Sequence, residues 1–266
     1  MTYERIKLNE SKKRAQYIRE LFEKNKLSIN NLSHLGKLLS SIENIKNDET
    51  TESQIIKILD LNRLYDALII IESQKIDMSM LKRLKKGKLD FNDHKNDDGK
   101  NILFELEIAS LLINKGIKVK FEEPDITFEI DGKRIGIACK KVNSIKSLGK
   151  AISKGSKQNK GANVDYAIVA INIDNYHPVG FLLCMETRIK AMNFIHQKNE
   201  DFFKEQSKHI NKYLNNNSLQ SVFIDSRIKI DIAQEIPRFN NLKATSAIQS
   251  NIDKDINGRF KDLLVD

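Results

Sequence analysis

A two-residue turn at Asp131-Gly132 constrains the fold of this chain more than any other feature. Asp-Gly favours a type I′ turn, which needs positive φ at both positions and joins two antiparallel strands. The segments 118–122 and 126–130 before the turn are short and rich in β-branched and aromatic residues with partial alternation, as is typical of strands. We therefore predict a β-hairpin in which residue 130 lies opposite residue 133.

The hairpin register predicts which side chains share a face of the sheet. Counting back from the turn places Asp125 opposite Ala138. Because side chains alternate along a strand, Asp125, Gly136, Ala138 and Lys140 are expected on one face, and Lys141 on the other. Gly136 and Ala138 are small, so we expect this face to leave room for a ligand.

The helix predicted before the hairpin carries two glutamates. At about 100° per residue, Glu107 falls on a polar stripe with Ser110 and Asn114, whereas Glu105 falls among apolar residues. A carboxylate in apolar surroundings is costly unless it is paired or binds a cation. We therefore expect Glu107 to face solvent and favour Glu105 as a functional residue.

The helical Glu105, the Pro124-Asp125 pair, the hairpin and the strand-borne Lys140 resemble the PD-(D/E)XK nuclease superfamily over residues 100–173. The resemblance implies an α/β fold with a restriction-endonuclease-like mixed central sheet flanked by helices. It also implies a magnesium cofactor, for which manganese would substitute, since magnesium takes oxygen ligands and bridges to phosphate. Asp125 and the backbone carbonyl of Cys139 would bind the ion, and Glu105 would complete its shell. Lys140 would orient or help deprotonate the attacking water.

The chain departs from the pattern of that superfamily at Ala138, where the family places Glu, Asp or sometimes Gln. Three explanations are open. The carboxylate has migrated and Glu105 compensates, or an acidic residue was replaced deliberately to inactivate the protein. The third explanation is a natural relative that binds nucleic acid without cleaving it.

A lysine-rich helix predicted over residues 147–158 follows the hairpin. Charge neutralisation by Lys and Arg is the main source of nucleic-acid affinity, so we predict phosphate contacts on and beside this helix. The alternative is an ordinary solvated helix. Gln158 resembles a glutamine that related nucleases often carry here. The residues predicted to contact nucleic acid are Lys146, Lys150, Lys154, Lys157 and Gln158.

The domain organisation is predicted from helical periodicity and from turn-rich composition. Residues 1–88 show helical patterns throughout and are expected to form an α-helical domain for dimerisation, partner docking or DNA grip. Residues 89–99 are polar and turn-rich and are expected to form a linker. Residues 100–266 would form the nuclease-like domain. Its second half is predicted as a buried strand at 165–173, one or two helices at 185–213, a strand at 221–232 and a closing helix at 251–265.

The composition narrows the classes of partner. The 266 residues carry a formal net charge of +9, which favours acidic partners, including nucleic acid. No apolar run approaches the roughly 18 residues needed to cross a membrane, and the N-terminus has no signal-like apolar core. We therefore expect a cytoplasmic protein without membrane contact.

The residues and the resemblance together favour a metal-dependent endonuclease that hydrolyses DNA phosphodiester bonds, with RNA as the other candidate substrate. The resemblance to restriction enzymes also implies a bacterial restriction or anti-phage effector. The alternative is a catalytically inactive nuclease fold that binds nucleic acid or a protein partner.

Overall fold

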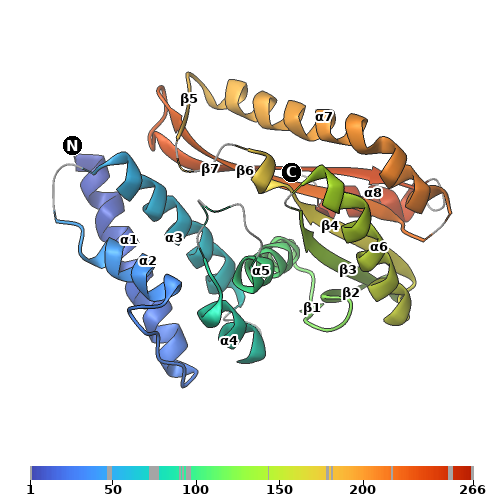
Figure 1. The fold of residues 1–266 in the computed structure, drawn as a ribbon, viewed down its shortest axis with the longest axis horizontal. Helices are drawn as coiled ribbons and strands as arrows, with labels where there is room; N and C mark the ends of the chain where they lie inside the picture. Colours follow the sequence, from blue (N-terminus) through green and yellow to red (C-terminus); the bar gives the residue numbers. More distant parts are fainter. Residues whose placement is uncertain are drawn as a thin grey trace. The chain divides into compact units, whose positions relative to one another are not determined.

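The structure is a computed structural model that describes most of the chain. The described residues are 2–46, 50–71, 78–89, 91, 93, 97–142, 144–177, 180, 182–216, 218–250 and 254–264. Over these residues the protein is mixed α/β, with eight α-helices, one 3-10 helix and seven strands in a mixed sheet (Figure 1). The expectation of a mixed central sheet flanked by helices is therefore confirmed.

The described part of the chain begins with five helices, continues with a short strand and a hairpin, and ends with a mixture of helices and strands. The α-helices are α1 (Thr2–Lys24), α2 (His34–Glu43), α3 (Glu52–Ile71), α4 (Met78–Lys86), α5 (Asp98–Asn114), α6 (Ile145–Gly161), α7 (Arg188–Asn215) and α8 (Lys254–Leu264), and the 3-10 helix is η1 (Asp174–Tyr176). The strands are β1 (Val119–Lys120), β2 (Ile126–Ile130), β3 (Lys133–Lys141), β4 (Tyr166–Asn172), β5 (Leu183–Met185), β6 (Ser221–Ile232) and β7 (Phe239–Gln249).

Internal contacts divide the chain into two compact units. The first comprises Met1–Leu106, Pro178–Ala191 and Lys229–Leu242, and the second comprises Glu107–His177, Met192–Ile228 and Lys243–Asp266. The boundary expected at residues 89–99 stays a prediction. Among the described residues, no helix is both long and apolar enough to cross a membrane.

In the first unit, α1, α2 and α3 pack against one another. Ile18 of α1 and Leu64 of α3 are fully buried, and an edge-to-face pair joins Tyr17 and Tyr65 with ring centroids 5.3 Å apart. The helix α2 begins at His34. Because the Ser33 hydroxyl accepts a hydrogen bond from a backbone N–H in the first turn, the cap sets that start.

In the second unit, the hairpin has the predicted register. Ile130 pairs with Lys133 and Ile126 pairs with Ile137 in antiparallel β2 and β3. Asp131 and Gly132 have φ values of 50° and 73°, as a type I′ turn requires. The strand expected over 118–122 shrinks to the two residues of β1.

The helix α6 is the crossover between parallel strands β3 and β4 and packs against both. Parallel strands need such a long connection, so the hairpin is followed by a helix instead of another tight turn. The strand order is β1-β2-β3-β4-β6-β5, with β7 also paired to β6. The strands predicted at 165–173 and 221–232 correspond to β4 and β6, and the segment 185–213 corresponds to the single helix α7.

Candidate functional site

The hairpin brings Asp125 and Lys140 together, as predicted. Asp125 lies directly before β2, Lys140 lies near the end of β3, and Lys140 Nζ is 2.8 Å from Asp125 Oδ2. The backbone N–H of Cys139 donates to the same oxygen at 2.7 Å. The side chains of Lys140 and Asp125 are only 14% and 17% exposed. The pair is therefore oriented by the hairpin backbone and largely shielded from water.

The ammonium group of Lys140 bridges two oxygen atoms. Besides Asp125 Oδ2, it donates to the carbonyl oxygen of Cys139 at 2.9 Å. These are the two oxygens that the family resemblance assigns to a metal. Burial raises the pKa of the Asp125 carboxyl above its ordinary value, although Lys140 and the Cys139 N–H oppose this shift.

Gln158 of α6 reaches the same end of the hairpin. Its Nε2 donates to the backbone oxygen of Pro124 at 3.1 Å, directly before Asp125. Its Oε1 is buried and has no hydrogen-bond partner among the described residues. Gln158 therefore ties α6 to the segment that carries the carboxylate. Its contact with nucleic acid, which the resemblance implies, stays a prediction.

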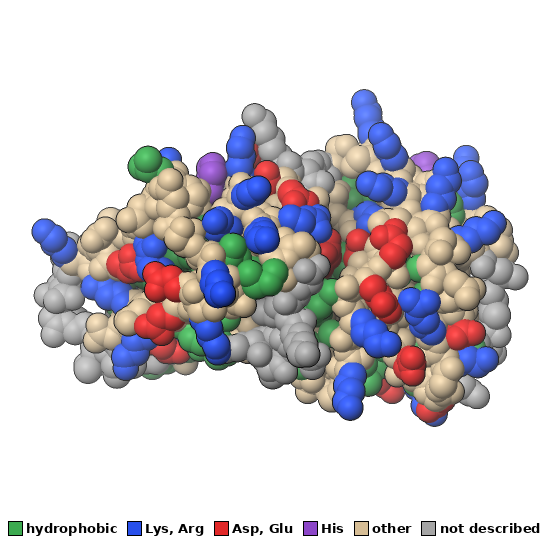
Figure 2. Space-filling view, turned by 90° about the horizontal axis from the view of Figure 1, so that it is seen from below, with side chains coloured by type: hydrophobic (Ala, Val, Ile, Leu, Met, Phe, Trp, Pro, Cys, Tyr) green, Lys and Arg blue, Asp and Glu red, His purple; other side chains and the backbone are tan. Residues whose placement is uncertain are grey.

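The four lysines predicted as a basic surface are all solvent-exposed: Lys146, Lys150, Lys154 and Lys157. Their spacing of three or four residues places them on one stripe of α6. On the face of the molecule shown in Figure 2, Lys and Arg side chains are spread among Asp and Glu and do not form one basic patch. Phosphate contact by the lysine stripe stays a prediction.

The expectation that small residues leave room for a ligand on this face is wrong. A Cβ on Gly136 would lie 2.5 Å from Asn159 Oδ1, and a Cβ on Gly155 would lie 3.2 Å from the Cβ of Ala138. Ala138 is fully buried in an apolar cluster that includes residues of α6 and α7. The small side chains allow α6 to pack closely on the sheet, so position 138 is a packing position.

The expectation that Glu107 faces solvent is also wrong. Glu107 is 6% exposed, and its Oε1 lies 3.3 Å from Arg227 Nη2. Helical phase fails here because α5 is buried on nearly every side. Glu105 is also buried, but it belongs to the first unit, whereas Asp125 and Lys140 belong to the second. Metal binding by Glu105 stays a prediction.

Lys141 points away from the Asp125–Lys140 pair, as the hairpin register predicts. Its Nζ donates to Asn172 Oδ1 at 2.8 Å and lies 3.7 Å from Asp174 Oδ2. Asp174 in turn accepts a hydrogen bond from the Arg227 backbone N–H at 3.0 Å. A second polar cluster thus forms where β3 and β4 end.

The centre of this second cluster is Asp225 on β6, a residue that sequence reasoning missed. Its side chain is 1% exposed, and it accepts from Asn172 Nδ2 at 3.3 Å. Arg227 Nε lies 3.8 Å from Asp225 Oδ2. Lys243 Nζ lies 3.3 Å from Asp225 Oδ1, which is an ion-pair distance, but the geometry is not that of a hydrogen bond. The available signal was an aspartate directly after the apolar run 222–224. Because its positive and negative side chains balance, the cluster fits a structural role.

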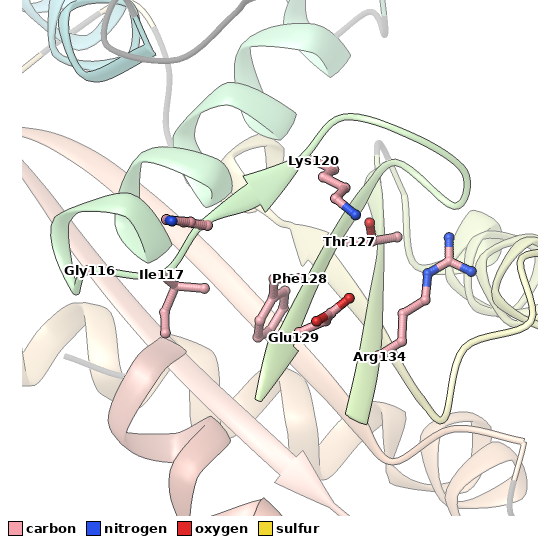
Figure 3. A pocket seen from close by; sticks show the side chains of 8 residues that line it. Gly116, Ile117, Lys120, Thr127, Phe128, Glu129 and Arg134 are labelled. Atoms are coloured by element: carbon pink, nitrogen blue, oxygen red, sulfur yellow. The ribbon is translucent and has the colours of Figure 1, made fainter. Parts of the chain in front are cut away.

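A pocket of about 420 Å³ lies beside the edge strand β1 in the same unit (Figure 3). It is lined by Gly116, Ile117, Lys118, Lys120, Thr127, Phe128, Glu129 and Arg134. Arg134 donates from Nη2 to Glu122 at 3.2 Å and from Nη1 to the carbonyl of Ala162 at 2.7 Å. Its guanidinium is thus already paired, and the predicted site residues do not line this pocket.

The donor set near Asp125 suits a magnesium ion that keeps most of its water. Within the described parts of the chain, no three His, Cys, Asp or Glu side chains gather closely enough to hold a metal ion. One carboxylate and one backbone carbonyl do converge on a cation, namely the ammonium of Lys140. Magnesium is commonly held by one or two carboxylates plus waters and substrate phosphate, so these two oxygens fit it.

The chain matches no protein-family model, no curated protein and no solved structure. The resemblance to PD-(D/E)XK nucleases therefore depends on the residues of the hairpin and its neighbouring helices. It remains a hypothesis to be tested by experiment.

Proposed function

We propose that the chain is a metal-dependent nuclease whose restriction-endonuclease-like core consists of α5, β1, β2, β3, α6 and β4. The observation that supports it best is the buried contact of Lys140 with Asp125 and with the Cys139 carbonyl. A carboxylate, a carbonyl oxygen and a lysine at the end of one hairpin are the groups that phosphodiester hydrolysis needs: two metal ligands and one cation for the phosphate.

In this proposal each residue has a separate task. Asp125 and the Cys139 carbonyl would hold the magnesium ion, with water completing its shell. Bound magnesium would supply a water of lowered pKa and stabilise negative charge at the phosphate. Lys140 would orient the attacking water and offset charge as the phosphate becomes pentacoordinate. Gln158 would keep the segment around Asp125 in position through its bond to Pro124.

DNA is the proposed substrate, because an exposed lysine stripe on α6 follows directly after the strand that carries Lys140. Positive side chains next to a phosphodiesterase site would hold the backbone of the nucleic acid. RNA offers the same phosphates and is the alternative substrate. A restriction or anti-phage setting rests on the family resemblance alone.

Cleavage of plasmid and linear DNA in Mg²⁺ tests the proposal. Asp125→Ala and Lys140→Ala should each abolish cleavage, whereas Lys133→Met should not, because Lys133 is exposed at the other end of the same strand. Circular dichroism would show that all three variants fold. Cleavage that survives both Asp125→Ala and Lys140→Ala would rule out this site.

A nucleic-acid-binding protein without catalysis is the second candidate. It is favoured by the full burial of Ala138, at the position where the family carries its second carboxylate. This candidate predicts DNA binding that weakens with salt, together with no cleavage in Mg²⁺ or Mn²⁺. Metal-dependent cleavage by the chain with Ala138 in place would exclude it.

A further inference from the structure

The ammonium of Lys140 lies where two oxygens converge on a cation. Its Nζ is 2.8 Å from Asp125 Oδ2 and 2.9 Å from the carbonyl oxygen of Cys139. A magnesium ion would need oxygen ligands at about 2.0–2.1 Å. The ammonium and the metal ion therefore cannot occupy the space between these two oxygens at the same time.

We propose that Lys140 is a built-in competitor for the metal. In the metal-free protein its ammonium occupies the cation site formed by Asp125 and Cys139, and a divalent ion enters only by displacing it. The inference rests on the proposed function for the identity of the cation. It adds a role for Lys140 in setting metal affinity, separate from any role in the chemical step.

Burial explains why the lysine holds this position. With side chains only 14% and 17% exposed, Lys140 and Asp125 would each lose a partner in poorly hydrated surroundings if they separated. An incoming divalent ion would compensate Asp125 in place of the lysine. The Cys139 N–H holds the carboxylate at 2.7 Å independently of Lys140, so the carboxylate stays oriented while the cation changes. The displaced lysine has a flexible four-carbon stem that would let it reach a substrate phosphate.

Isothermal titration calorimetry of the full chain with Mn²⁺ tests the competition by measuring the Kd for the ion. Lys140→Met removes the ammonium and keeps an unbranched side chain, and it should bind Mn²⁺ about tenfold more tightly than the unmodified chain, because a nearby positive charge repels a divalent ion. Lys140→Gln is a second neutral variant and should behave alike. Lys140→Arg keeps the charge and should bind no more tightly than the unmodified chain. Lys133→Met is the matched control, an exposed lysine on the same strand, and should leave the affinity unchanged.

Two results would overturn the competition. The first is a folded Lys140→Met or Lys140→Gln chain that binds Mn²⁺ no more tightly than the unmodified chain. The second is tight binding by Lys140→Met that persists after Asp125→Asn, which would place the ion elsewhere. DNA cleavage assayed in parallel separates the two proposals. Tighter Mn²⁺ binding by the neutral variants supports the competition even where the unmodified chain cleaves no nucleic acid, and that outcome would refute only the nuclease function.

Discussion

Replacing Ala138 with glutamate tests whether the carboxylate that the family pattern expects can exist in this fold. Ala138 is fully buried, and its Cβ lies 3.2 Å from where a Cβ on Gly155 would be. The neighbouring side chains in its cluster, including Leu148, Ile152 and Val169, are apolar. A glutamate adds four heavy atoms to a space that α6 already fills, and it brings a carboxyl group without an evident partner.

The expected cost has two parts. Overpacking a close-packed core costs about 1–3 kcal/mol. A buried polar group without its hydrogen bonds costs about 1–3 kcal/mol more. Ala138→Glu should therefore lower the free energy of unfolding by about 2–6 kcal/mol, a large share of the roughly 5–15 kcal/mol that stabilises a typical domain.

Urea unfolding followed by far-UV circular dichroism measures this cost. Ala138→Gln is the matched control, because glutamine fills nearly the same volume without an ionisable group. Both variants should be destabilised, and the difference between them isolates the carboxyl group. The reasoning would be refuted by an Ala138→Glu chain that is as stable as the unmodified one and binds Mn²⁺ more tightly. That result would mean that position 138 faces the metal site and that the missing carboxylate is the reason for any lack of activity.

Further predictions concern packing, the buried charge cluster and the lysine stripe. Gly155→Ala should destabilise the protein by about 1–2 kcal/mol, because its methyl would lie 2.8 Å from a valine methyl of β4, and overpacking outweighs the gain in helix propensity of about 1 kcal/mol. Gly149→Ala in the same helix would meet only two ring atoms of a histidine of α7, at 3.5 and 3.9 Å, and should stabilise the protein by about 0.5–1 kcal/mol, so equal urea midpoints for the two variants would contradict the packing. Asp225→Ala should cost about 3–5 kcal/mol in thermal unfolding, since it removes the buried anion beside Arg227 and Lys243, and a loss below about 1 kcal/mol would show that this anion is dispensable. Combined Lys150→Glu and Lys154→Glu substitutions should flatten the dependence of log Kd for DNA on log salt by about 2, and an unchanged slope would exclude phosphate contacts there.

The parts of the site that were predictable from the sequence are those that follow from the alternation of side chains along a strand. An Asp-Gly turn fixes the register of a hairpin, and the register alone places Asp125 beside Lys140 and Lys141 on the opposite face. No knowledge of the surrounding packing is needed for this step. The same parity argument identified the strand that became β6, but it missed β7, where alternation is weak because Asn, Lys, Thr and Ser interrupt the apolar residues.

The predictions that were wrong depend on which other elements cover each face of a helix or strand. Neither the alternation of side chains along a strand nor the angular positions of residues around a helix gives that information. The placement of Glu107 on a solvated stripe assumed that α5 has one side in water. The structure buries that helix almost completely, so the assumption fails. Asp225 gave a weak signal because two of its partners, Asn172 on β4 and Lys243 on β7, come from other segments of the chain, and only Arg227 lies on the same strand. Long-range ion pairs of this kind leave no local pattern in a single sequence.

Small residues can indicate either an open ligand site or a close packing contact, as is the case for Gly136, Ala138 and Gly155. Small side chains on a strand next to a carboxylate suggest an open ligand site when only the hairpin is considered. The structure places a glycine of α6 against that strand, so small residues face one another and bring helix and sheet into close contact. A close approach of this kind holds α6, and with it Gln158, against the segment that carries Asp125. Position 138 is thus a packing position, and any metal site would draw its other ligands from water, from the backbone or from elsewhere in the chain.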